Sequence, residues 1–168
     1  MIYTNQTVEI TATNGDFRPQ PDIRKLNVRI EESMDVQVEI NGRIDESEVI
    51  ELYRANGWSS ADKPDQLISA LRNSHTLVTA RVDSVLVGVG NAISDGHLVV
   101  YYPHMLVHPG KQGNGIGRKM MQAMQSVYGC FHQQMLTADG GAIEFYKTLG
   151  FKIAGNTKPM WIYTGSEH

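Results

Sequence analysis

Apolar residues recur at two spacings along the chain, and each spacing predicts one kind of element. Alternation of apolar and polar residues, as at Val36, Val38 and Ile40, is typical of a strand with one buried face. Two later runs are rich in β-branched residues and flank a turn at 83–84. The segments that we expect to be strands are 36–40, 76–81, 85–92, 98–107, 133–138, 151–154 and 160–163.

Helical spacing marks four other segments. In the longest of them Ile116, Met120, Met124 and Val127 recur every three or four residues, which places them on one face of a helix. The helices that we expect are 45–55, a second that begins at Pro64 and carries Leu67, Ile68 and Leu71, a third over 116–128, and a fourth over 142–149. Strands that alternate with helices predict a mixed α/β (α+β) fold, with a central mixed, largely antiparallel sheet flanked by helices.

The first 35 residues follow a different pattern. Apolar residues alternate at 8–12 and again at 26–30, but prolines interrupt the stretch between them. We therefore expect an N-terminal extension over 1–35, as a hairpin or a partly ordered arm, and the main domain over 36–168.

Composition narrows the function classes. The net charge of −3 gives no general footprint for nucleic acid, and no apolar run is long enough to cross a membrane. The single cysteine, Cys130, excludes an internal disulfide framework. The N-terminus lacks the pattern of a signal peptide, so a cytoplasmic protein is the simplest expectation.

The segment 106–118 carries the most specific chemistry. An apolar run ends at a Pro-Gly turn, glycines occupy alternate positions from Gly113 to Gly117, and a helical pattern begins at once. The first N–H groups of a helix have no partner within it, and the helix dipole adds positive charge there. With the basic residues Lys111 and Arg118, this arrangement predicts a site for phosphate or pyrophosphate.

Two common phosphate motifs fail in this segment. Ile116 and Gly117 stand where a P-loop requires Lys and Ser or Thr, and Arg118 stands where a dinucleotide fingerprint requires glycine. The pattern that remains is Q-x-x-G-x-G, formed by Gln112, Gly115 and Gly117. It resembles the coenzyme A pyrophosphate loop of the GNAT superfamily of N-acetyltransferases.

A second segment resembles the same family. Residues 139–151 are similar to its N-x-x-A-x-x-F/L-Y-x-x-x-G-F motif, with Ala142 and Tyr146 in place. Asp139 departs from the pattern, because the family usually has Asn there and a carboxylate donates no hydrogen bond unless it is protonated. The two segments occur in the family's order and at about its spacing.

The resemblance covers roughly residues 36–163 and implies a GNAT-like fold with acetyl-CoA as co-substrate. It implies that the pantetheine arm contacts the backbone of the strand that ends at Val107, where the sheet splays. The residues that it assigns to cofactor binding are Leu106, Val107, Lys111, Gln112, Gly113, Asn114, Gly115, Ile116, Gly117, Arg118 and Asp139.

The implied reaction is acetyl transfer to a primary amine by direct attack. An alkylamine has a pKa of about 10.4, so a base or a water chain must remove its proton before it attacks. The resemblance makes Tyr146 the acid that protonates the departing thiolate. His104 either accepts the amine proton or anchors a relay water, although a structural histidine on the sheet fits equally well.

The acceptor is a small-molecule amine or a lysine side chain, and Trp58, Tyr102 and Trp161 are candidates for its pocket, although each fits a core position as well. Weak similarity to chloroplast-type serotonin acetyltransferases suggests an arylalkylamine or a lysine-type acceptor, and a polyamine stays open. Strand edges in this fold often pair between subunits, so a homodimer is one assembly that the resemblance allows.

Two alternatives remain at this point. Cys130 could carry the acyl group with His132 as base, but no third group is in place to orient them, and the position fits a small buried residue. A non-catalytic module that binds coenzyme A would keep the loop without turnover. We expect no metal, because the histidines at 97, 104 and 108 are loosely spaced and lack companion ligands.

Overall fold

The computed structural model describes residues 34–163. The chain divides into two units, 1–32 and 33–168. The alternating segments predicted at 8–12 and 26–30 lie outside the described residues, so the predicted extension stays a prediction.

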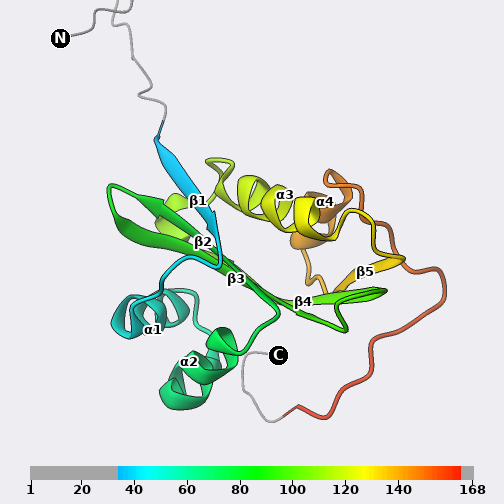
Figure 1. Ribbon diagram of the computed structural model, residues 1–168, viewed down its shortest axis with the longest axis horizontal. Helices are drawn as coiled ribbons and strands as arrows, with labels where there is room; N and C mark the ends of the chain where they lie inside the picture. Colours follow the sequence, from blue (N-terminus) through cyan, green and yellow to red (C-terminus); the bar gives the residue numbers. More distant parts are fainter. Residues whose placement is uncertain (1–33, 164–168) are drawn as a thin grey trace, which may run out of the picture. The chain divides into compact units, whose positions relative to one another are not determined.

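A five-stranded sheet forms the centre of the second unit, and its strands follow one another in chain order (Figure 1). The first four strands pair antiparallel, whereas the fifth pairs parallel to the fourth. The predicted mixed, largely antiparallel sheet is thereby confirmed. The strands are β1 (Val36–Ile40), β2 (Thr76–Val82), β3 (Val85–Ser94), β4 (Val99–Val107) and β5 (Gln133–Leu136).

Helices cover both faces of this sheet (Figure 1). One face carries α1 and α2, whose apolar side chains form a core with Leu77, Val89 and Leu106. The opposite face carries α3, which packs on Val78, Val100 and their neighbours. The helices are α1 (Glu46–Ala55), α2 (Pro64–Arg72), α3 (Ile116–Tyr128) and α4 (Ala142–Lys147), with short 3-10 turns η2 (Ser59–Asp62) and η3 (Pro109–Lys111).

Two predicted strands are wrong. Residues 151–154 and 160–163 have no regular secondary structure, and Ile153, Met160 and Ile162 are at least 70% exposed. A strand needs a neighbour for its backbone groups and a surface for its side chains, and β-propensity alone supplies neither. Val127 is also more exposed than predicted, at 40%, because the buried stripe of α3 is centred on Met124 and Val127 lies at its margin.

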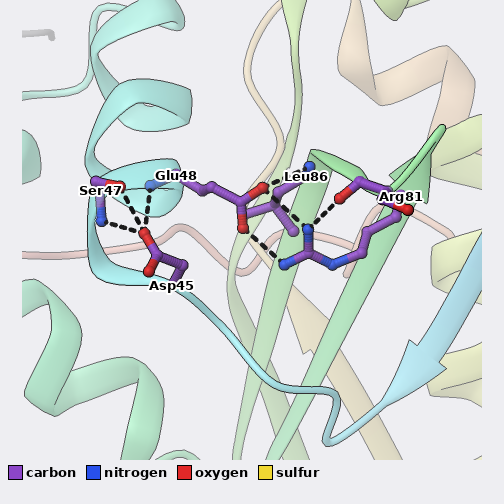
Figure 2. A network of polar contacts seen from close by, with 6 residues as sticks. Asp45, Ser47, Glu48, Arg81 and Leu86 are labelled. Atoms are coloured by element: carbon purple, nitrogen blue, oxygen red, sulfur yellow. Dashed lines mark hydrogen bonds and ion pairs between the residues drawn. The ribbon is translucent and has the colours of Figure 1, made fainter.

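Two carboxylates at the start of α1 hold it in place: Asp45 caps the helix, and Glu48 fixes it to the sheet (Figure 2). Asp45 caps the helix, because its Oδ1 accepts hydrogen bonds from the backbone N–H groups of Ser47 and Glu48 at 2.9 and 3.3 Å. One turn further, the carboxylate of Glu48 accepts two N–H groups of Arg81 at 2.9 and 2.7 Å. The same carboxylate accepts the backbone N–H of Leu86 at 3.1 Å, so a single side chain connects α1 to both β2 and β3.

We expect Glu48→Ala to lower the free energy of unfolding by about 1–2 kcal/mol, because it removes three hydrogen bonds at a site that is only partly screened by water. Urea unfolding measures this change. The matched control is Glu46→Ala, which removes an exposed ion pair with Arg72 and should cost less than about 0.5 kcal/mol. Equal losses in the two variants would contradict a special role for Glu48.

The same contact predicts a dependence on pH. The hydrogen bond from Arg81 holds the pKa of Glu48 below its ordinary value of 4.5. A lowered pKa in the folded state means that the contribution is complete above pH 4.5 and is lost as the pH falls below it. The difference in unfolding free energy between the wild type and Glu48→Gln should therefore shrink between pH 5 and the acid range. A difference that stayed constant over this range would contradict the assignment.

Candidate functional site

The sheet opens between β4 and β5. The parallel pairing runs from Val99 opposite Gln133 to Tyr102 opposite Leu136, where β5 ends. β4 continues to Val107, still paired with β3 on its other side. Among the described residues, the edge of β4 over 103–107 therefore has no strand partner on the β5 side, in agreement with the splay that the family resemblance implies.

The hydrogen-bond pattern fixes which backbone groups face this opening. The N–H of His108 donates to the carbonyl of Val87 at 2.8 Å, and the bonds of an antiparallel ladder alternate along each strand. The backbone groups of Leu106 therefore point toward β3, whereas those of Met105 and Val107 point into the opening. Consistent with this phase, the carbonyl of Val107 accepts a hydrogen bond from Nε2 of Gln112 at 3.0 Å.

This alternation of the backbone groups along β4 changes one of the predicted cofactor contacts. Val107 has its backbone groups in the opening, whereas Leu106 faces β3 with its backbone and is 2% exposed. Met105 takes its place as the second residue with backbone groups in the opening. The sequence pattern did not single out Met105, because alternation along a strand does not tell which residues pair with which neighbour.

The glycine-rich loop leads from the end of β4 to the start of α3. Gly113 and Gly115 have φ angles of 80° and 75°, a region that favours glycine. Asn114 braces the loop, because its Nδ2 donates to the carbonyls of Lys111 and Gln112 at 3.1 Å each. The loop is thus held in one conformation by its own side chains.

The first turn of α3 has the features of an anion site. Gly115 is the N-cap residue, and it has no side chain that could accept a hydrogen bond from the first turn. The backbone N–H groups of residues 116–118 can therefore donate to an anion. The side chain of Ile116 is 1% exposed, so this residue offers only its backbone to a ligand. Arg118 donates to Oγ1 of Thr148 at 2.8 Å and thereby connects α3 to the end of α4.

Tyr146 lies on α4 and packs against the core on the α3 face of the sheet. Its ring makes edge contacts with Phe145 and Phe151 at centroid distances of 5.0 and 5.8 Å. Burial raises the pKa of Tyr146, so the phenol keeps its proton at neutral pH. The residue can therefore act as a proton donor, the role that the family resemblance implies for it.

His104 lies on β4 and joins a cluster of rings on the α1 face. The hydroxyl oxygen of Tyr53 is 2.6 Å from Nδ1 of His104. The indole ring of Trp58 stands edge-on to both, with centroid distances of 5.3 Å to His104 and 5.9 Å to Tyr53. The structure thus brings together two predicted residues, Trp58 and His104, and adds Tyr53, which the sequence analysis did not single out.

The comparisons with known proteins agree with this geometry. Residues 73–153 match the family model described as an acetyltransferase (GNAT) domain. A GNAT-family acetyltransferase from Streptococcus pneumoniae superposes with a TM-score of 0.68 at 25% identity, over 77% of this chain and 98% of its own. The chain contains a GNAT acetyltransferase domain. A protein from Deinococcus radiodurans, also described as an acetyltransferase, has a TM-score of 0.66 at 26% identity over 77% and 88% of the two chains.

The domain match and the acetyltransferase neighbours support an N-acetyltransferase rather than a non-catalytic module. The GNAT family uses acetyl-CoA, and one solved neighbour, an aminoglycoside N-acetyltransferase, is in complex with CoA. That neighbour has a TM-score of 0.60 at 13% identity over 80% of this chain and 97% of its own, which shows the shared fold. No curated protein matches the sequence.

Several predicted residues lie away from the ring cluster in this GNAT domain. Tyr102 is 3% exposed and belongs to the core on the α3 face, where its hydroxyl donates to Oε1 of Gln134 at 2.8 Å. Trp161 is 62% exposed and stacks on Tyr163. Asp139 is exposed at the approach to α4 and does not cap that helix. The structure therefore brings neither Tyr102 nor Trp161 to His104.

The alternative nucleophile has no support in the GNAT domain. Cys130 is exposed rather than buried as the sequence analysis expected, and His132 is exposed as well. Among residues 34–163, no three His, Cys, Asp or Glu side chains gather closely enough to hold a metal ion. Within the same part of the chain, no helix is long and apolar enough to cross a membrane.

Proposed function

We propose that the residues around the β4–β5 opening transfer the acetyl group of acetyl-CoA to a primary amine by direct attack. The observation that carries the proposal is one continuous path of unpaired backbone groups. It begins in the opening at Met105 and at the N–H of Val107, whose carbonyl Gln112 already occupies, and it ends at the uncapped N–H groups of α3. Extended amides pair well with the first part, and a pyrophosphate pairs well with the second.

Coenzyme A fits this path in shape and in charge. The groups we assign to it are the backbone at 105 and 107, the loop residues Lys111, Gln112, Gly113, Asn114 and Gly115, and the first turn Ile116, Gly117 and Arg118. A Cβ at Gly117 would lie 3.4 Å from the ring of Phe145, so little room is left between α3 and α4 at this point. We also assign Asp139 to the cofactor, as an exposed carboxylate that can only accept hydrogen bonds from it.

The chemistry requires two proton movements. The bound thioester supplies an activated acetyl group, and attack forms the N–C bond while the C–S bond breaks. The amine loses its proton through His104 or through a water that His104 holds. The thiolate takes a proton from Tyr146, and desolvation raises the thiol's pKa as it raises that of the phenol, which keeps the transfer feasible.

The rings beside His104 favour an acceptor with an apolar or aromatic body. Trp58 is partly buried and presents its ring at the α1 face, where it can contact an aromatic amine or the stem of a lysine. An arylalkylamine or a lysine-type amine therefore suits the site better than a polyamine. We further propose that the activity belongs to residues 36–168, with residues 1–35 as an extension.

We expect Tyr146→Phe to lower kcat by about 10²–10⁴-fold, because the thiolate loses its proton donor. The apparent Kd for coenzyme A, measured by titration calorimetry, should stay within about threefold of the wild type. Thiol release from acetyl-CoA measures the rate. Full turnover of the phenylalanine variant across the pH range would show that Tyr146 is not the acid.

The acceptor class is tested with arylalkylamines, lysine peptides and polyamines in the same thiol-release assay. We expect kcat/KM to be highest for aromatic or lysine-type amines and to fall about tenfold or more in Trp58→Leu, since the ring contact is lost. The matched control is Trp161→Leu, which changes an exposed tryptophan outside the ring cluster. Binding of coenzyme A without thiol release for any amine would overturn the proposed function.

A further inference from the structure

Three apolar side chains stand side by side across β3, β4 and β5. In the register of the sheet Ile93 lies opposite Tyr101, and Tyr101 lies opposite Met135. Ile93 is 57% exposed and Met135 is 44% exposed, while Tyr101 between them is half-buried. Side chains opposite one another in neighbouring strands have Cβ atoms about 5 Å apart, so the three form one continuous apolar row.

The row lies on the α1 face of the sheet. One chain neighbour of each member packs in the core on the α3 face, namely Ala92, Tyr102 and Leu136. Successive side chains of a strand point to opposite faces, so the row itself points to the α1 side. Among the described residues, the core that α1 and α2 form with the sheet includes no member of the row, and β4 and β5 extend beyond these helices (Figure 1).

The row ends beside the opening of the sheet. The last pair that joins β4 and β5 is Tyr102 with Leu136, one residue beyond Tyr101 and Met135. The proposed function places the pantetheine arm in this opening, and Tyr146 packs in the core on the α3 face. Since Tyr146 protonates the departing sulfur from that face, the α1 face is the one from which the amine can attack.

We infer that the row formed by Ile93, Tyr101 and Met135 is the floor on which the body of the acceptor lies. This assignment rests on the proposed function, because that function brings the amine to the same face. The amino group is at the opening, and the carbon skeleton extends from it over Tyr101 toward Ile93 and Met135. The acceptor is then a primary amine with an extended apolar or aromatic body.

The chemistry of the floor selects among amines. On the same face the next pair along β4 and β5 is Val99 opposite Gln133, and neither side chain is charged. The carboxylate of Asp95, in the turn after β3, accepts the backbone N–H groups of residues 97–99 through one oxygen at 2.9 to 3.1 Å. A second ammonium group on the floor would lose water to carbon, with no carboxylate in the row to pair with it. The floor therefore favours a monoamine over a diamine or a polyamine.

The direct test is the chain length of the acceptor, with ethylamine, n-butylamine and n-hexylamine as probes in the thiol-release assay. Each methylene that reaches the floor removes apolar surface from water, so we expect kcat/KM to rise about twofold or more per added methylene. The compound 1,6-diaminohexane has the same carbon chain as n-hexylamine and a second ammonium group, and its kcat/KM should be about tenfold or more lower. Acetyl transfer that does not depend on chain length would overturn the inference and leave the proposed function intact.

Substitutions in the row locate the floor. Ile93→Thr and Met135→Gln keep similar shapes on exposed positions and replace carbon by polar groups. We expect the double variant to raise KM for n-hexylamine about fivefold or more and to leave KM for ethylamine and for acetyl-CoA within about twofold, since a short amine does not reach the row. The matched control is Val85→Thr, at the other end of β3 and 59% exposed, which should leave all three constants unchanged. An equal rise in KM for the short and the long amine would contradict the floor.

Binding without turnover separates this inference from the proposed function. Titration calorimetry gives the Kd of n-hexylamine and of ethylamine for the full-length protein saturated with coenzyme A, which carries no acetyl group to transfer. Tighter binding of n-hexylamine that weakens in the double variant, together with no acetyl transfer to any amine, would refute the proposed function and support the floor.

A second copy of the chain on the row gives a different result. Light scattering would then show a dimer for the wild type and a monomer for the double variant, and this outcome would overturn the inference. We expect the same mass for both proteins.

Discussion

The short pairing between β4 and β5 is the constraint on which the site depends. β4 has nine residues and β5 has four, so more than half of β4 must find other partners for the backbone groups on that side. Gln112 satisfies one of them, the carbonyl of Val107, and at the same time fixes the beginning of the glycine-rich loop. The rest remain open to a ligand that is itself extended and rich in amides. The helix that connects the two strands starts at the same end of β4, which brings its unpaired N–H groups to the same ligand.

The sheet also separates the two proton carriers that we propose. Tyr146 belongs to the layer of α3 and α4, whereas His104 belongs to the layer of α1 and α2. In the proposed function, both residues act on the thioester and amine bound at the opening beside β4. Each carrier is held by aromatic neighbours in its own layer, so a change in one layer need not disturb the other. Glu48 contributes from a distance, because it fixes the helix that carries Tyr53 to the sheet.

Local signals in the sequence sufficed for the elements and for the loop. The turn at Asp83 and Ser84, the proline that begins α2 and the glycines around α3 act over a few residues, and the elements beside them form as predicted. The pairing phase of β4 and the contact between Tyr53 and His104 join residues far apart in the chain, so no local pattern reveals them. The strands predicted after α4 are wrong for the same reason. Phe151 packs against the core, but the residues that follow it find no strand partner within the described part of the chain.

The strand order has a consequence for how the site comes into being during folding. Strands β1 to β4 each pair with a neighbour in the chain, and the β2–β3 and β3–β4 connections are short, so these pairings cost little loop entropy. Pairing of β5 with β4 closes a loop that contains the whole of α3, so it costs more loop entropy than the two short connections. The meander that carries His104 can therefore assemble before the opening beside it exists. The opening beside β4 is thus bounded by a pairing between distant segments, so a ligand that binds there stabilises a less local contact than the turns of the meander provide.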